Sequence, residues 1–166
     1  MARFGSRIAD VNASTDSPGV RFPPPLLYAL VVVGGWMLHR PWPLPIANAT
    51  GVLTVVAWLL VACWVGLAAS SVGLFRRKQT SMIPFRPAST LVSTGPYKFT
   101  RNPMYVSLAL LTLAFAFFLN TWWIVVLLVP ALLIVQRFVI VPEEKYLRRR
   151  FGADYEAYTH RVRRWL

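Results

Sequence analysis

Acidic residues are scarce in this chain of 166 residues, where six aspartates and glutamates stand against 18 lysines and arginines, a formal net charge of +12. Charged residues make up only 14% of the chain, whereas soluble domains contain about 25%. Apolar residues make up 56%, which excludes intrinsic disorder and argues against a soluble globular domain. The composition favours a protein embedded in a membrane.

Cysteine and histidine are also scarce. Cys63 is the single cysteine, so the chain can form no internal disulfide and no zinc site built from several cysteines. His39 and His160 are the two histidines, and their separation does not match a metal-binding motif. We therefore expect no metal in the functional site.

Long apolar runs dominate the rest of the sequence, and a helix needs about 20 apolar residues to cross a bilayer. Four runs are candidates; the first is short, and only Asn120 and Thr121 separate the last two. They cover approximately residues 26–38, 46–75, 104–119 and 122–141. We predict an all-α integral membrane protein with four transmembrane helices, the last two forming a hairpin.

Basic residues mark one side of this predicted protein. With four spans, 17 of the 18 lysines and arginines share a side, and Arg40 lies on the other. Because cytoplasmic loops are rich in lysine and arginine, we place both termini and the second loop in the cytoplasm. A polar tail, residues 1–22, then precedes a single membrane domain, residues 23–166. Lipid headgroups account for the charges, so nucleic acid is not a predicted partner.

The segment after the fourth run has an amphipathic pattern. Pro142 suits the first turn of a new helix, and Gly152 suits a break. Aromatic and apolar residues then recur at helical spacing with arginines between them, at Tyr155, Tyr158, Val162 and Trp165. We expect this final helix to lie at the membrane interface, either as an anchor or as the cover of a site.

The loop before the third run is the first candidate for chemistry. Asn102 followed by Pro103 predicts the N-cap and first turn of a helix, whose free N–H groups favour an anion. Arg101 adds charge, and Tyr97 and Tyr105 add aromatic faces. This set suits a ligand with a carboxylate, a cation and a ring. The same residue types are also ordinary at a membrane boundary.

Two glutamates favour a ligand site over an ordinary membrane boundary. Glu143 and Glu144 directly follow the fourth run, on the same predicted side as Asn102. Acids at a membrane boundary are candidates for function. The alternative is that they compensate a helix dipole and pair with Lys145 and Arg148.

Together these pieces resemble the isoprenylcysteine carboxyl methyltransferase family of integral membrane enzymes, which is similar to the membrane phospholipid N-methyltransferases. The resemblance covers residues 84–166, and the first two runs match only as generic membrane helices. The matching segments are Leu91-Val-Ser-Thr-Gly-Pro-Tyr97, Arg101-Asn-Pro-Met-Tyr105, Glu143-Glu144-x-x-Leu147 and Phe151-Gly-x-x-Tyr155-x-x-Tyr158.

The resemblance implies methyl transfer from S-adenosylmethionine, with S-adenosylhomocysteine as product and no metal. It implies a cytoplasmic cofactor site and a lipid-like or prenylated acceptor that enters from the bilayer. The residues it assigns to the cofactor are Leu91, Val92, Tyr97, Asn102, Pro103, Met104, Tyr105 and Glu143. It also implies a catalytic role for Glu143, which would hold a polar group of the cofactor or position the reacting centre, and for Arg137 as a ligand of the acceptor's carboxylate.

Two positions depart from the family pattern. Asn102 stands where the family has histidine, and asparagine cannot act as a general base near neutral pH. Val139 stands where a basic residue often contacts substrate, so Arg137 is the nearest base. We therefore expect an acceptor that is already anionic, such as the carboxylate of a prenylated cysteine. Glu143 and Tyr105 are the alternative bases.

Two other classes of function are alternatives. An NADPH-dependent membrane reductase of sterols or isoprenoids has a similar C-terminal architecture, but this short chain has no long segment for a nicotinamide cofactor. A non-enzymatic lipid-binding scaffold would tolerate joint replacement of the candidate residues without any loss beyond stability. The sequence does not indicate an oligomeric state.

Overall fold

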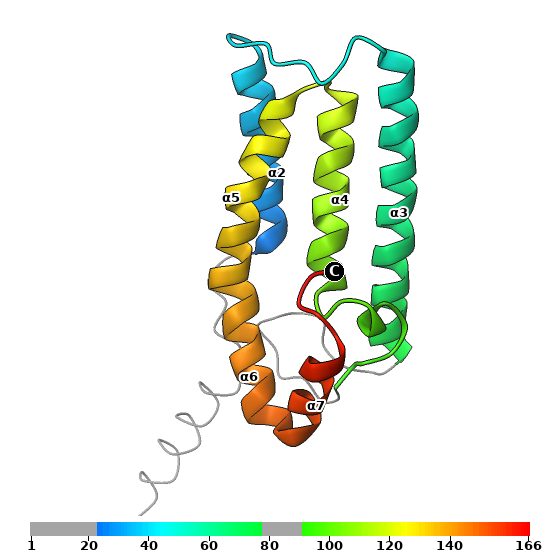
Figure 1. The fold of residues 1–166 in the computed structure, drawn as a ribbon, viewed down its shortest axis with the longest axis vertical. Coiled ribbons are helices and arrows are strands. Elements are labelled where there is room, and N and C mark those ends of the chain that lie inside the picture. Colours follow the sequence, from blue (N-terminus) through cyan, green and yellow to red (C-terminus); the bar gives the residue numbers. More distant parts are fainter. Residues whose placement is uncertain (1–22, 78–90) are drawn as a thin grey trace, which may run out of the picture.

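The computed structural model describes residues 23–77 and 91–166, and the regular elements among these residues are all helices. This confirms the all-α class. The predicted tail, 1–22, and the first part of the motif region, 84–90, lie outside the described residues. Four apolar helices run roughly side by side (Figure 1). They are α2 (Pro24–His39), α3 (Thr50–Arg77), α4 (Pro103–Phe118) and α5 (Trp122–Val135).

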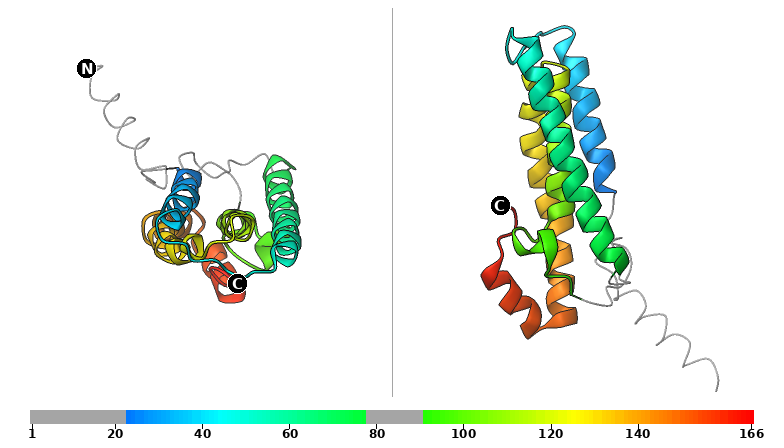
Figure 2. Two further views of the ribbon diagram at one scale, coloured as in Figure 1. Left: turned by 90° about the horizontal axis from the view of Figure 1, so that it is seen from above. Right: turned by 90° about the vertical axis from the view of Figure 1, so that its right-hand side faces the viewer.

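Helix α4 lies in the middle of the bundle. Viewed along the helices, α2 and α5 flank it on one side and α3 on the other (Figure 2). Helix α3 packs mainly against α4, so most of its surface faces outward, and only 11% of its most apolar window is buried. Apolar residues on the outside of a helix are expected where lipid replaces water.

Two helices are long and apolar enough to cross a membrane. These candidate spans are Thr50–Leu74 and the continuous helical stretch Trp122–Phe151. Helices α2 and α4 are apolar but have 16 residues each, about 24 Å of helix against the roughly 30 Å of a bilayer core. The structure thus places a helix at each of the four predicted runs. Two of these runs, at α3 and α5, lie in helices long enough to be candidate spans.

The turn between α4 and α5 also shapes the neighbouring loop. Asn120 adopts a positive φ of 47°, a conformation that asparagine tolerates. Its side-chain oxygen accepts hydrogen bonds from the backbone N–H groups of Ile46 (2.8 Å) and Ala47 (3.2 Å), and its amide donates to the Ala47 carbonyl (2.9 Å). The prediction that the second helix begins near Ile46 is therefore wrong. These residues are held in a loop, and α3 begins at Thr50.

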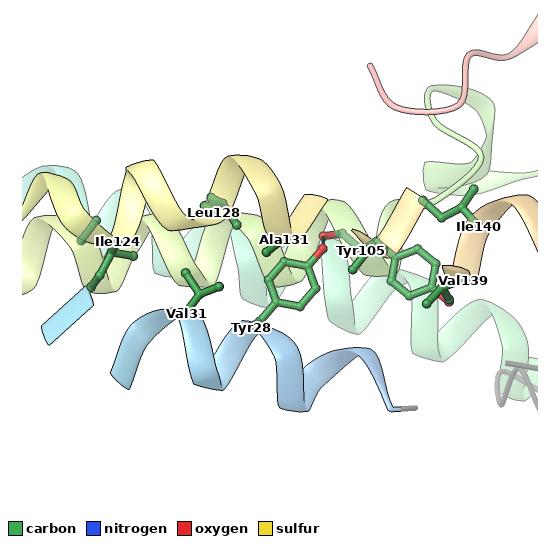
Figure 3. Close-up of a cluster of buried hydrophobic side chains, with 10 residues drawn as sticks. Tyr28, Val31, Tyr105, Ile124, Leu128, Ala131, Val139 and Ile140 are labelled. Carbon is green, nitrogen blue, oxygen red and sulfur yellow. Dashed lines mark hydrogen bonds between the residues drawn. The ribbon is translucent and has the colours of Figure 1, made fainter. Parts of the chain in front are cut away.

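The core between α2 and α5 depends on a close approach of two backbones. Tyr28 and Val31 of α2 are buried against Ile124, Leu128 and neighbouring apolar residues (Figure 3). One turn beyond Val31, a Cβ at Gly35 would lie 2.8 Å from the backbone nitrogen of Ile124. Glycine is required there because any larger residue would push the helices apart.

The helix after α5 is not a new one, contrary to expectation. Residues Gln136–Ile140 form a π-helical turn, η2, which joins α5 without a break to α6 (Val141–Phe151). The Val141 N–H donates to the Gln136 carbonyl, five residues back. Pro142 has no N–H to donate, and the wider turn lets the helix continue past it.

The chain then turns at Gly152, with φ of +51°, into α7 (Ala153–Arg161). The predicted helix is confirmed at Tyr155 and Tyr158, but its continuation through Val162 and Trp165 is wrong. Helix α7 ends at Arg161, and Val162 is extended. Tyr155, Tyr158 and Val162 form a second buried apolar cluster, against which Leu91, Leu147 and Phe151 pack. The final residues instead run back toward the start of α4 (Figure 2).

We predict that Gly35→Ala destabilises the protein by about 1–3 kcal/mol, because the added methyl group overpacks the contact with Ile124. The measurement is thermal unfolding in detergent. Gly34→Ala is the matched control: its Cβ would lie 3.5 Å from a Leu127 methyl group, an ordinary contact. Equal stability of the two variants would contradict the close approach.

Candidate active site

The side chains of Tyr105 and Glu143 meet at the end of the bundle where α4 begins. The Tyr105 hydroxyl donates a hydrogen bond to a Glu143 carboxylate oxygen at 3.0 Å. Tyr105 lies in the first turn of α4, and Glu143 lies 21 positions after Trp122, about 31 Å along a continuous helix. In a membrane-spanning helix that begins at Trp122, this separation would place the pair near the far edge of the roughly 30 Å bilayer core.

Tyr28 contacts the backbone of Tyr105. Its hydroxyl donates to the Tyr105 carbonyl at 3.3 Å, and the two side chains are 3% and 9% exposed (Figure 3). Tyr28 lies on α2, so two separate hydrogen bonds, one at the Tyr105 carbonyl and one at its hydroxyl, connect α4 to α2 and to α6. The orientation of the Tyr105–Glu143 pair thus depends on three helices.

A third tyrosine lies beside this pair. Tyr97 is buried in a short 3-10 helix, η1 (Gly95–Lys98), and its carbonyl accepts a hydrogen bond from the Tyr158 hydroxyl at 2.7 Å. Burial raises the pKa of Tyr97, and the nearby Glu143 carboxylate raises it further. Tyr97 therefore keeps its proton at physiological pH and acts as an aromatic wall or a donor. Val92, at 5% exposure, and half-buried Leu91 lie just before η1.

Asn102 occupies the N-cap position of α4, but its side chain does not cap the helix. Its amide nitrogen donates instead to the Arg164 carbonyl at 2.8 Å. Pro103 is fully buried behind it, and Met104 is half-buried. The predicted helix start, with Asn102 as the N-cap residue, is confirmed, but the Asn102 side chain makes no capping hydrogen bond and instead contacts the C-terminal backbone.

Glu144 is buried between two arginines. Arg164 Nη2 lies 2.7 Å from one carboxylate oxygen, and Arg101 Nη2 lies 3.4 Å from the other. The Glu144 side chain is 9% exposed. The expected partner Arg148 pairs instead with exposed Glu156, at 3.3 Å. Glu144 is therefore a structural anion, which leaves Glu143 for chemistry.

Arg101 has unused hydrogen-bonding capacity. Its side chain is 12% exposed, and its Nε and Nη1 atoms are buried without a hydrogen-bond partner among the described residues. A buried guanidinium donor normally has an acceptor. The two atoms therefore fit an anionic group of a ligand.

Arg137 is not brought to this cluster. It lies in η2, is exposed, and its guanidinium is 6.0 Å from the centroid of the Phe138 ring. No hydrogen bond or ion pair connects it to Tyr105 or Glu143 within the part of the chain that the structure describes. Its role as an acceptor ligand stays a prediction.

Sequence reasoning missed two contributors to the site. The pattern placed Tyr28 in a generic span, and nothing in its neighbours indicates a contact with Tyr105. Arg164 was interpreted as the polar face of a helix, although it pairs with Glu144. Among residues 23–77 and 91–166, no group of three or more metal-ligating side chains occurs.

The arrangement offers an acidic group, a guanidinium with two N–H donors that have no partner among the described residues, and aromatic rings at one end of an apolar bundle. Comparison with known proteins identifies its class: residues 52–154 match the model of the phospholipid methyltransferase family. This chain belongs to that family. Members are membrane proteins that transfer a methyl group from S-adenosylmethionine to a lipid-like acceptor.

A relative is known from Haemophilus influenzae. This uncharacterized protein is 40% identical to the chain over 66 residues, which cover 38% of the chain and all of the relative. No solved structure matches the chain.

We predict that Glu144→Gln lowers the free energy of unfolding by about 3 kcal/mol, because it leaves Arg101 and Arg164 without their buried counter-charge. Glu156→Gln is the matched control and costs less than about 1 kcal/mol, since its pair with Arg148 is exposed. Thermal unfolding in detergent measures both. Similar losses in the two variants would contradict the structural role of Glu144.

Proposed function

We propose that this chain methylates the carboxylate of a membrane-embedded, lipid-like acceptor, such as a prenylated cysteine, at the Tyr105–Glu143 pair. Two observations support the proposal: the hydrogen bond between Tyr105 and Glu143, and Arg101 on the adjacent Glu144, whose buried Nε and Nη1 atoms have no partner among the described residues.

The residues present fit S-adenosylmethionine. Arg101 would hold its carboxylate, and Glu143 would hold its ammonium or another polar group. The rings of Tyr97 and Tyr105 would lie against its aromatic and cationic parts, since tyrosine faces attract cations. Leu91, Val92 and the helix start at Asn102, Pro103 and Met104 would complete the wall. The cofactor would supply an electrophilic methyl group on a sulfonium. The methyl–sulfur bond would break as the carboxylate oxygen bonds to the methyl group, which gives a methyl ester and S-adenosylhomocysteine with no proton to remove.

A carboxylate acceptor is supported by the absence of a basic side chain at position 102, which is an asparagine. Asn102 is not a base, and its amide is already bonded to the Arg164 carbonyl. An α-carboxyl group is ionised above a pKa of about 3.5 and needs no base at neutral pH. The protein would then act by orientation, which can supply several kcal/mol of the barrier. An exposed Arg137 near the lipid edge would attract the carboxylate.

The competing functions lack such an observation. A nicotinamide-dependent reductase requires room for a dinucleotide, and no contact among the described residues suggests it. A scaffold would not need the buried donors of Arg101 to be left without acceptors.

We predict saturable binding of S-adenosylhomocysteine to the detergent-purified protein, measured by calorimetry. Glu143→Ala weakens binding about 10- to 100-fold and Tyr105→Phe about tenfold, because each removes a hydrogen bond to a charged group. Glu156→Ala, an exposed acid on α7, leaves binding unchanged. A folded protein that binds NADPH instead would favour the reductase, and one that binds neither would favour the scaffold.

The acceptor is tested by methyl transfer in native membranes with radiolabelled S-adenosylmethionine. We expect label on a prenylated cysteine with a free carboxylate and none on its methyl ester. The acceptor's own ionisation contributes no pH dependence between pH 6 and 9, since its carboxylate is charged throughout that range. Label on the amine of phosphatidylethanolamine, with a rate that rises with pH, would contradict a carboxylate acceptor. It would show that the acceptor is an amine and make Glu143 the candidate base.

A further inference from the structure

The residues after α7, which we call the C-terminal latch (residues 163–165), bond to the start of α4. The Arg163 carbonyl accepts from the Arg101 N–H at 3.0 Å. The Arg164 carbonyl accepts from the Asn102 amide at 2.8 Å and from the Thr100 hydroxyl at 3.2 Å. Three consecutive residues before α4 are thus bonded to two consecutive carbonyls.

The side chains of the latch reach the neighbouring helix. Arg164 Nε and Nη2 donate to the two Glu144 oxygens at 3.0 and 2.7 Å, a bidentate pair with fixed geometry. Trp165 Nε1 donates to Gln136 Oε1, in the π-helical turn, at 2.7 Å. The latch therefore ties the start of α4 to both α6 and η2.

These ties lie next to the Tyr105–Glu143 pair without contacting it. Tyr105 lies three residues after Asn102, and Glu143 directly precedes Glu144. The 3.0 Å bond between Tyr105 and Glu143 therefore spans the same two elements that Arg164 joins. The family match ends at residue 154, so it includes no part of the latch.

We propose that Arg164 is a positioning residue: by joining Asn102 to Glu144, it holds the start of α4 against α6 and keeps the Tyr105 hydroxyl on the Glu143 carboxylate. The expected effect of Arg164 on cofactor binding rests on the proposed function. The structural part of this proposal does not, because it concerns only contacts within the chain.

The structural part is tested by hydrogen exchange on the purified protein without cofactor. Arg164→Ala should raise the exchange rates of the Arg101, Tyr105 and Val106 amides about tenfold, since the first bonds to the latch and the others to the Asn102 carbonyl. Arg164→Lys, which keeps the charge but not the bidentate geometry, should give an intermediate increase. Arg149→Ala removes an exposed arginine of α6 and should give no increase. Equal exchange in Arg164→Ala and Arg149→Ala overturns the proposal.

The functional part is tested by titrating the same variants with S-adenosylhomocysteine. Arg164→Ala should weaken binding about tenfold, and Arg164→Lys less. Adding Tyr105→Phe to Arg164→Ala should cost little more, because both disturb the same pair. Multiplied losses, or full binding by Arg164→Ala with raised exchange, would show that Arg164 stabilises the fold without positioning the site. Absence of binding by the wild type overturns the proposed function, while the exchange data still decide the role of Arg164.

Discussion

The end of the bundle where α4 begins is organised by the buried carboxylate of Glu144. A charge removed from water must be paired, and here Arg101 and Arg164 pair with it from two other parts of the chain. These pairings bring the loop before α4, helix α6 and the C-terminal residues to one point. The neighbouring Glu143, bonded to the Tyr105 hydroxyl, is thereby left available for a ligand.

The two adjacent glutamates therefore have different tasks. In sequence they are indistinguishable, since both follow an apolar run in a chain with six acids. In the structure Glu144 faces two guanidinium groups, whereas Glu143 faces a phenol. A phenol stabilises a carboxylate by one hydrogen bond without neutralising it. Glu143 can thus form an ion pair with a positively charged group of a ligand, whereas the Glu144 carboxylate is already paired with two arginines.

The sequence was informative wherever local chemistry decides the structure. Apolar runs located the helices, Asn120 the hairpin and Gly152 the break, because each rests on residues close together in the chain. The candidate residues Tyr97, Tyr105 and Glu143 were found from their residue types near the ends of apolar runs and from a family resemblance, and the structure brings them together. Contacts between distant segments were beyond such reasoning. The bond from Tyr28 to Tyr105 joins residues 77 positions apart, and the amide of Asn102 donates to a carbonyl 62 positions away.

The π-helical turn at Gln136–Ile140 has a consequence for the phase of the helix that contains it. Each residue of an α-helix turns the next side chain by about 100°. A wider turn absorbs one additional residue without changing the axis, so the acidic segment is rotated by about that angle relative to an uninterrupted helix. Helix α5 can therefore pack its apolar face on α2, while α6 places Glu143 and Glu144 on the side that faces α4. Deleting one residue of the turn would rotate both glutamates away from α4.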